Sequence, residues 1–182
     1  MKYKKLIIFM PSIEGGGVEK NLFIVTNFLS KKINNVSVIS ASKNHYKKFN
    51  RKVNFITPKS YLWDSFGRRI KYFTCLLILI KEIIKIKNIV VFSFQANIYC
   101  IIVCKIFRIK IISRSNSSPS GWSKNLIKRF IFRAVLNMAD QVMVNSLEFK
   151  GELKKKLNVN SICIYNPLNT KEIIAKSKKK SI

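Results

Sequence analysis

The sequence predicts an α/β fold in which a doubly wound, mostly parallel sheet of about six or seven strands carries helices on both faces. Short apolar runs alternate with longer helical patterns along the chain, as in successive βαβ units. The first apolar run ends at a triple glycine, Gly15-Gly16-Gly17, and a helical pattern follows at once. With 182 residues and 48% hydrophobic composition, the chain is expected to form one domain with a sizeable core.

Seven short runs of apolar and β-branched residues have the length of buried strands. The run at 36–40 alternates apolar and polar residues, whereas the run at 89–94 is nearly all apolar, as in a strand covered on both faces. The expected strands cover residues 6–10, 36–40, 53–56, 89–94, 110–113, 141–144 and 161–165.

Five segments repeat apolar residues at the spacing of one helix face. They cover residues 18–32, 65–87, 96–107, 126–138 and 146–157. Asp64 or Ser65 is the expected N-cap of the second helix. In the fourth, Lys128, Arg129 and Arg133 lie on the polar side. The opposite, apolar face of that helix consists of Leu126, Ile127, Phe130, Ile131, Ala134, Val135 and Met138. Residues 42–52 and 115–123 are expected to be polar loops.

The triple glycine followed by a helix predicts an anion site. The first amides of a helix lack internal partners, and glycine lets a phosphate approach the backbone closely. Lys20 could help to hold that phosphate, whereas Glu19 is better explained by the helix dipole. The loop is not a P-loop, because no Gly-Lys-Ser/Thr follows, and it is not a dinucleotide fingerprint, because Lys20 stands where the third glycine would be. A merely flexible turn is the alternative interpretation.

Other polar residues follow the ends of the predicted strands. In a parallel sheet these ends share one edge, where ligands bind at the topological switch point. We therefore expect the glycine loop to lie beside Gln95, Arg114, Asn116, Asn145 and Ser146. For the loop at Arg114, a solvated surface segment is the competing interpretation.

The net charge of +27 favours anionic partners, either nucleic acid or the anionic face of a membrane. No motif of an RNA-recognition domain, zinc finger or helix-turn-helix is present, so specific nucleic-acid recognition is not expected. Neither a signal peptide nor a membrane-spanning segment is predicted, which favours a cytoplasmic protein, in part peripheral on the inner face of the membrane.

Few residues are suited to metal binding or acid–base catalysis. His45 is the one histidine, which excludes a catalytic histidine dyad. The four cysteines form no CxxC pair and lie in apolar surroundings, as buried reduced thiols do. The eight acids are too scattered to predict paired-carboxylate chemistry. No metal site is therefore expected, and the catalytic residues stay unassigned.

Three segments together resemble a known family. Residues 11–20 contain the glycine loop, residues 139–146 read Ala-Asp-Gln-Val-Met-Val-Asn-Ser, and residues 164–169 read Ile-Tyr-Asn-Pro-Leu-Asn. In this order they resemble the N-terminal domain of family 4 glycosyltransferases, which have the GT-B fold.

The resemblance implies a Rossmann-like domain over 1–170 and a basic tail over 171–182 that leads toward a second domain. It implies transfer of a sugar from a nucleotide-sugar to a glycan or lipid-linked acceptor, in the synthesis of a cell-surface polysaccharide such as lipopolysaccharide, without a metal. It assigns Gly15, Gly16, Gly17 and Lys20 to the donor diphosphate, Gln95, Arg114, Asn116, Asn145 and Ser146 to the acceptor or the cleft, and Asn166 and Pro167 to the interdomain hinge.

The sequence also departs from the family pattern. Gln95 stands near the position of a common histidine, Lys20 replaces the usual arginine, and Asn169 replaces the usual aspartate. Most of the family's nucleotide-sugar pocket lies in a C-terminal domain that this sequence does not contain. The chain is therefore expected to be inactive alone and to need a separate second half. The alternatives are a non-catalytic basic module that binds polyanions and a non-functional truncated remnant.

Overall fold

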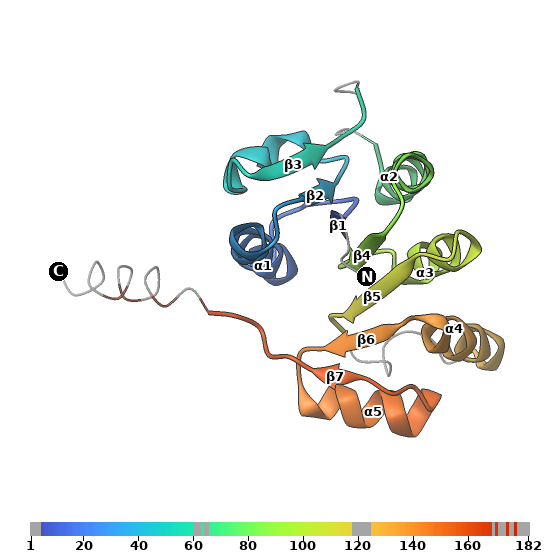
Figure 1. Ribbon diagram of the computed structural model, residues 1–182. Coiled ribbons are helices and arrows are strands. Elements are labelled where there is room, and N and C mark those ends of the chain that lie inside the picture. Colours follow the sequence, from blue (N-terminus) through green and yellow to red (C-terminus); the bar gives the residue numbers. More distant parts are fainter. Residues whose placement is uncertain are drawn as a thin grey trace.

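A seven-stranded sheet in which every pairing is parallel forms the centre of the computed structural model (Figure 1). The structure describes residues 5–59, 63, 66–117, 125–168, 170, 174 and 177. The strands are β1 (Lys5–Phe9), β2 (Val36–Ile39), β3 (Val53–Ile56), β4 (Ile89–Ser93), β5 (Lys110–Ser115), β6 (Gln141–Val144) and β7 (Ile162–Cys163). Their order in space is β3-β2-β1-β4-β5-β6-β7. This confirms the predicted doubly wound α/β fold, with the switch point between β1 and β4.

Helices cover both faces of the sheet (Figure 1). On one side lie α1 (Gly17–Lys32) and the short 3-10 helix η1 (Lys43–Lys48). On the other lie α2 (Arg68–Lys85), α3 (Asn97–Ile106), α4 (Leu126–Met138) and α5 (Leu147–Leu157). Two cores follow from this arrangement, because alternate strand residues point to opposite faces. For example, Ile7 of β1 packs toward α2 and α3, whereas Ile8 packs toward α1.

Asp140 fixes the entry to β6, and this explains part of the motif at residues 139–146. Its carboxylate accepts hydrogen bonds from the backbone N–H of Ile111, at 2.8 Å, and from Lys105 of α3. Its own N–H donates to the carbonyl of Ile111. Burial opposes ionisation of this carboxyl group, but the hydrogen bonds outweigh it and lower its pKa. Asp140 therefore holds β6, β5 and α3 together.

Some boundaries differ from the sequence predictions. Residues 43–48 form η1 rather than part of a loop, and β5 extends to Ser115. The strand expected at 161–165 has only two residues. The second helix begins at Arg68 after the N-cap Gly67, whereas the expected caps, Asp64 and Ser65, lie outside the described residues.

The largest difference concerns α4. Of its predicted apolar face, Val135 is buried, but most of the other residues are exposed to solvent. Val135, Leu136 and the half-buried Phe132 make the contact with the core instead. The helix is therefore turned so that most of its apolar stripe faces outward.

Candidate functional site

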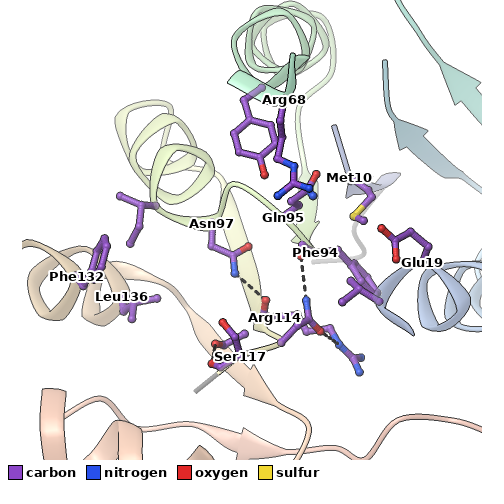
Figure 2. Close-up of a pocket in the computed structure, with 15 residues that line it drawn as sticks. Met10, Glu19, Arg68, Phe94, Gln95, Asn97, Arg114, Ser117, Phe132 and Leu136 are labelled. Atoms are coloured by element: carbon purple, nitrogen blue, oxygen red, sulfur yellow. Dashed lines mark hydrogen bonds between the residues drawn. The ribbon is translucent and has the colours of Figure 1, made fainter. Parts of the chain in front are cut away.

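A cavity of about 490 Å³ opens at the switch point, where the carboxyl ends of β1, β4 and β5 meet the first turns of α1, α2 and α3 (Figure 2). Its walls combine apolar, amide, hydroxyl and charged side chains. They are Met10, Val18, Glu19, Arg68, Tyr72, Phe94, Gln95, Asn97, Ile98, Arg114, Ser115, Asn116, Ser117, Phe132 and Leu136. The cavity lies where ligands bind in open parallel sheets.

Hydrogen bonds between β4, α3 and β5 build one wall of the cavity. Ala96 has a left-handed backbone conformation (φ 55°), and α3 begins immediately after it. Asn97 accepts a hydrogen bond from the buried hydroxyl of Ser93 and donates to the carbonyl of Arg114, both at 2.7 Å. Asn116 donates back to the carbonyl of Phe94 at 3.1 Å. These bonds fix the ends of two neighbouring strands relative to each other.

Arg114 is the most unusual residue of the site, because its charged side chain is only 1% exposed. Its guanidinium donates to Asn116 Oδ1 at 3.0 Å and to Asn166 Oδ1 at 2.6 Å. It also lies against the sulfur of Met143 and over the ring of Phe94. Within the described part of the chain, none of these partners is a carboxylate. Burial lowers the pKa of Arg114 because the charge is poorly solvated.

The bond from Arg114 to Asn166 joins two sets of predicted residues. Asn166 lies 52 positions along the chain from Arg114 and belongs to the predicted hinge with Pro167. The candidate cleft residue and the candidate hinge are therefore in direct contact, and Gln95 is nearby on the cavity wall. The oxygen of the Gln95 side chain accepts a hydrogen bond from the backbone N–H of Ser12 at 3.0 Å, which ties β4 to the loop after β1.

The glycine loop begins α1 beside the cavity. Gly15 needs its glycine backbone, since its φ is +90°. Gly16 is the N-cap and supplies no side chain to cap the first amides. The carboxylate of Glu19 covers this turn, since a Cβ on Gly16 would lie 2.9 Å from Glu19 Oε2. Gly17 has open space around it, and Lys20 is exposed. The start of α1 is thus accessible and has an acid of its own in the first turn.

Asn145 and Ser146 follow β6 and are not among the cavity walls. The hydroxyl of Ser146 accepts from the backbone N–H of Phe149 at 3.1 Å and caps α5. Asn145 has a buried side-chain oxygen with no hydrogen-bond partner among the described residues. The structure therefore gathers the predicted cleft residues of β4 and β5, and separates those of β6 from the cavity.

Sequence reasoning expected the segment 93–97, which includes Asn97, at this edge of the sheet, but it missed Arg68 and Tyr72 as site residues. Each lies in the first turns of a helix that follows a strand, so the topology places it at the same edge as the strand ends. His45 lies in η1 against Phe23, with ring centroids 6.3 Å apart, and does not line the cavity. Among the described residues, no three His, Cys, Asp or Glu side chains gather as metal ligands would.

Arg68 and Glu14 form an ion pair at the mouth of the cavity, which predicts a measurable titration. The hydrogen bond from Arg68, followed by that from Ser12, lowers the pKa of Glu14 from 4.5 to about 2. A lowered carboxylate pKa stabilises the fold above pH 4.5, and this stability is lost as the pH falls toward 2. Both side chains are half-exposed, so we expect the ion pair to contribute well under about 1 kcal/mol to the free energy of unfolding.

Carbon-detected NMR titration of the Glu14 carboxyl group measures this pKa directly. In Arg68→Gln we expect the midpoint to return toward 4.5, whereas Lys85→Gln, at the far end of α2, leaves it unchanged. A midpoint near 4.5 in the wild-type chain would show that the pair does not persist in solution.

Comparison with protein-family models and with curated proteins gives no match. Solved structures do match. HepE from Anabaena, in complex with UDP-glucose, aligns with a TM-score of 0.64 at 14% identity over 97% of this chain and 49% of HepE. UGT2 from Phytolacca americana, complexed with UDP-2fluoro-glucose and pterostilbene, gives 0.57 at 12% identity over 92% of this chain and 55% of UGT2. The chain has a GT-B glycosyltransferase-like fold. It spans about half the length of these neighbours.

This likeness confirms the Rossmann-like fold expected from the sequence and supports its assignment to the GT-B architecture. At these identities the likeness concerns the fold.

Proposed function

We propose that the chain is the N-terminal, acceptor-side half of a glycosyltransferase that uses a nucleotide-sugar donor. The observation that carries the proposal is the switch-point cavity, whose walls include the buried cation Arg114 and, at the start of α1, Val18 and Glu19. The exposed glycine turn precedes these two residues and does not itself line the cavity. Both features favour an anionic ligand, and a nucleotide diphosphate is such a ligand. The complexes of HepE and UGT2 with UDP-sugars support the same class of ligand.

In this proposal the chain contributes binding groups rather than a complete active site. The first amides of α1 bind diphosphate oxygens from one side, with Glu19 swinging away from Gly16 as they bind. A second domain, which begins after the hinge at Asn166 and Pro167, supplies the rest of the donor pocket. Arg114 contributes its positive charge to the binding of the diphosphate. The acceptor, a glycan or a lipid-linked precursor of a cell-surface polysaccharide, lies in the same cavity beside Gln95 and Asn97.

The α1 amides should bind UDP weakly even without a second domain. We expect a dissociation constant of about 1 mM, which corresponds to only about 4 kcal/mol of binding free energy. NMR titration of the ¹⁵N-labelled chain with UDP should shift the amide signals of Gly16, Gly17 and Val18. Amide shifts that are largest on another element would contradict the proposed position of the diphosphate.

Gly17→Ala separates binding from folding. A methyl group at Gly17 meets no atom within 4 Å in the fold, so stability should not fall. It does stand between the backbone and an approaching phosphate, so UDP affinity should decrease at least about fivefold. Gly151→Ala in α5 is the matched control, since its added methyl group also meets nothing within 4 Å. Equal UDP affinities for the two variants would refute the diphosphate role of the glycine loop.

A further inference from the structure

The outer surface of α2, α3 and α4 is apolar to an unusual degree. These helices lie side by side on one face of the sheet, with α3 packed between the other two (Figure 1). Together they expose large hydrophobic side chains along their whole lengths. These are Ile70, Phe73, Leu77, Ile84, Tyr99, Ile102, Ile106, Leu126, Ile127, Phe130, Ile131 and Met138. We refer to this set as the apolar helix face.

The exposed residues follow helical spacing, so they form stripes rather than scattered points. In α2, Phe73, Leu77 and Ile84 lie on one side, opposite the buried Cys75 and Leu79. In α4, Ile127, Phe130, Ile131 and Met138 form the stripe that sequence analysis assigned to one apolar face. Rows of exposed apolar side chains on neighbouring helices of a folded domain indicate an interaction site.

The charged residues of α2, α3 and α4 indicate an anionic partner for the apolar helix face. The three helices contain nine Lys and Arg residues and one acid, Glu82. That acid is engaged by Lys5 at 2.7 Å and by Lys85 at 3.6 Å. Most of the basic residues, among them Arg69, Lys81 and Arg133, are exposed between or beside the apolar stripes. Lys71, in the first turn of α2, is instead buried.

We propose that the apolar helix face docks on the anionic surface of a lipid bilayer. Helices with apolar residues on one side and Lys and Arg beside them bind in the interface of anionic membranes. Nucleic acid would account for the charge, and its bases could stack on Phe73 and Phe130, but it offers no extended apolar surface for the exposed aliphatic side chains of three helices. In the described part of the chain no helix is long and apolar enough to span a bilayer, so the helices would lie along its surface.

The docked orientation places the site at the membrane. A second hollow, of about 580 Å³, lies between α2 and α3 and is lined by Arg68, Arg69, Tyr72, Phe73, Leu76 and Tyr99. Arg68 and Tyr72 also line the switch-point cavity. If the proposed function holds, an acceptor with a lipid anchor could remain in the leaflet beside this hollow while its polar end reaches the cavity.

Vesicle co-sedimentation tests the docking with the full chain. Vesicles of phosphatidylglycerol and phosphatidylcholine are compared with vesicles of phosphatidylcholine alone. We expect the wild-type chain to bind the anionic vesicles at least tenfold more strongly. In Phe73→Ser/Phe130→Ser, whose native side chains are 65% and 71% exposed, we expect the affinity for the anionic vesicles to fall at least tenfold. The control Phe28→Ser/Tyr46→Ser removes side chains that are 59% and 55% exposed on the α1 side of the sheet, and it should bind within twofold of wild type.

A second pair of variants tests the charges. Arg69→Gln/Arg133→Gln should weaken binding more than Lys31→Gln/Lys32→Gln, which removes two charges at the end of α1. Equal losses from the two pairs would mean that net charge alone drives binding, and this would overturn the proposal. Equal binding to both kinds of vesicle would also overturn it. The same holds if the wild-type chain is a dimer that Phe73→Ser/Phe130→Ser converts to a monomer while vesicle binding is unchanged, because the apolar helix face would then bind a second copy of the chain. UDP titration of the same samples reports separately on the proposed function.

Discussion

Arg114→Met should abolish much of the chain's affinity for anionic ligands while leaving it as stable as the wild type. A charge-assisted hydrogen bond contributes about 1.5–3 kcal/mol, so we expect UDP affinity to fall roughly ten- to a hundredfold. Stability should change by less than about 1 kcal/mol, because a methionine fills similar volume and removes a buried charge that no described carboxylate neutralises. Asn166 is exposed and Asn116 half-buried, so water can replace the lost donor.

This combination distinguishes a binding residue from a structural one. Urea denaturation measures the stability of Arg114→Met, and NMR titration with UDP measures its affinity. Arg133→Met, at an exposed position of α4, controls for the loss of one positive charge and should change neither quantity. A large loss of stability with unchanged UDP affinity would instead show that Arg114 serves to hold Asn116 and Asn166 in place.

The fold could be predicted because its determinants are local. The strands β1, β2 and β4 at the centre of the sheet are almost fully buried between helices, and this environment leaves a clear pattern of apolar and β-branched residues in the sequence. The glycine turn after β1 was recognisable for a similar reason, because Gly15 has a backbone conformation that other residues rarely adopt.

The orientation of α4 could not be predicted from its own residues. Its sequence contains two overlapping apolar faces, and the one that meets the core is decided by contacts with α3 and α5 rather than by periodicity. The burial of Arg114 was equally hidden. It depends on Asn166 and Met143, which are 52 and 29 positions away, and nothing near Arg114 in the sequence indicates that its side chain would turn inward.

Asn97→Ala is expected to destabilise the fold more than any other amide substitution in the site. Its side chain joins the buried hydroxyl of Ser93 to the carbonyl of Arg114, so alanine removes the donor from the Arg114 carbonyl and leaves the Ser93 hydroxyl with the Gln95 carbonyl, at 2.9 Å, as its acceptor. We expect the free energy of unfolding to fall by about 2 kcal/mol. In Asn97→Asp the free energy of unfolding should fall at least as much, because the aspartate keeps the acceptor for Ser93 but places a carboxylate oxygen against the Arg114 carbonyl.

Asn137→Ala is the matched control for this prediction. Asn137 also donates its amide to a backbone carbonyl, that of Arg133 at 2.9 Å, but on the exposed side of α4. Water can solvate that carbonyl in the variant, so stability should change by less than about 0.5 kcal/mol. Both substitutions replace a helical asparagine by alanine, which removes helix propensity as the cause of any difference. Equal midpoints of urea denaturation for the two variants would contradict the role of Asn97 in joining β4 to β5. A selective loss in Asn97→Ala, with weaker UDP binding in the folded fraction, would show that the same bonds also shape the cavity.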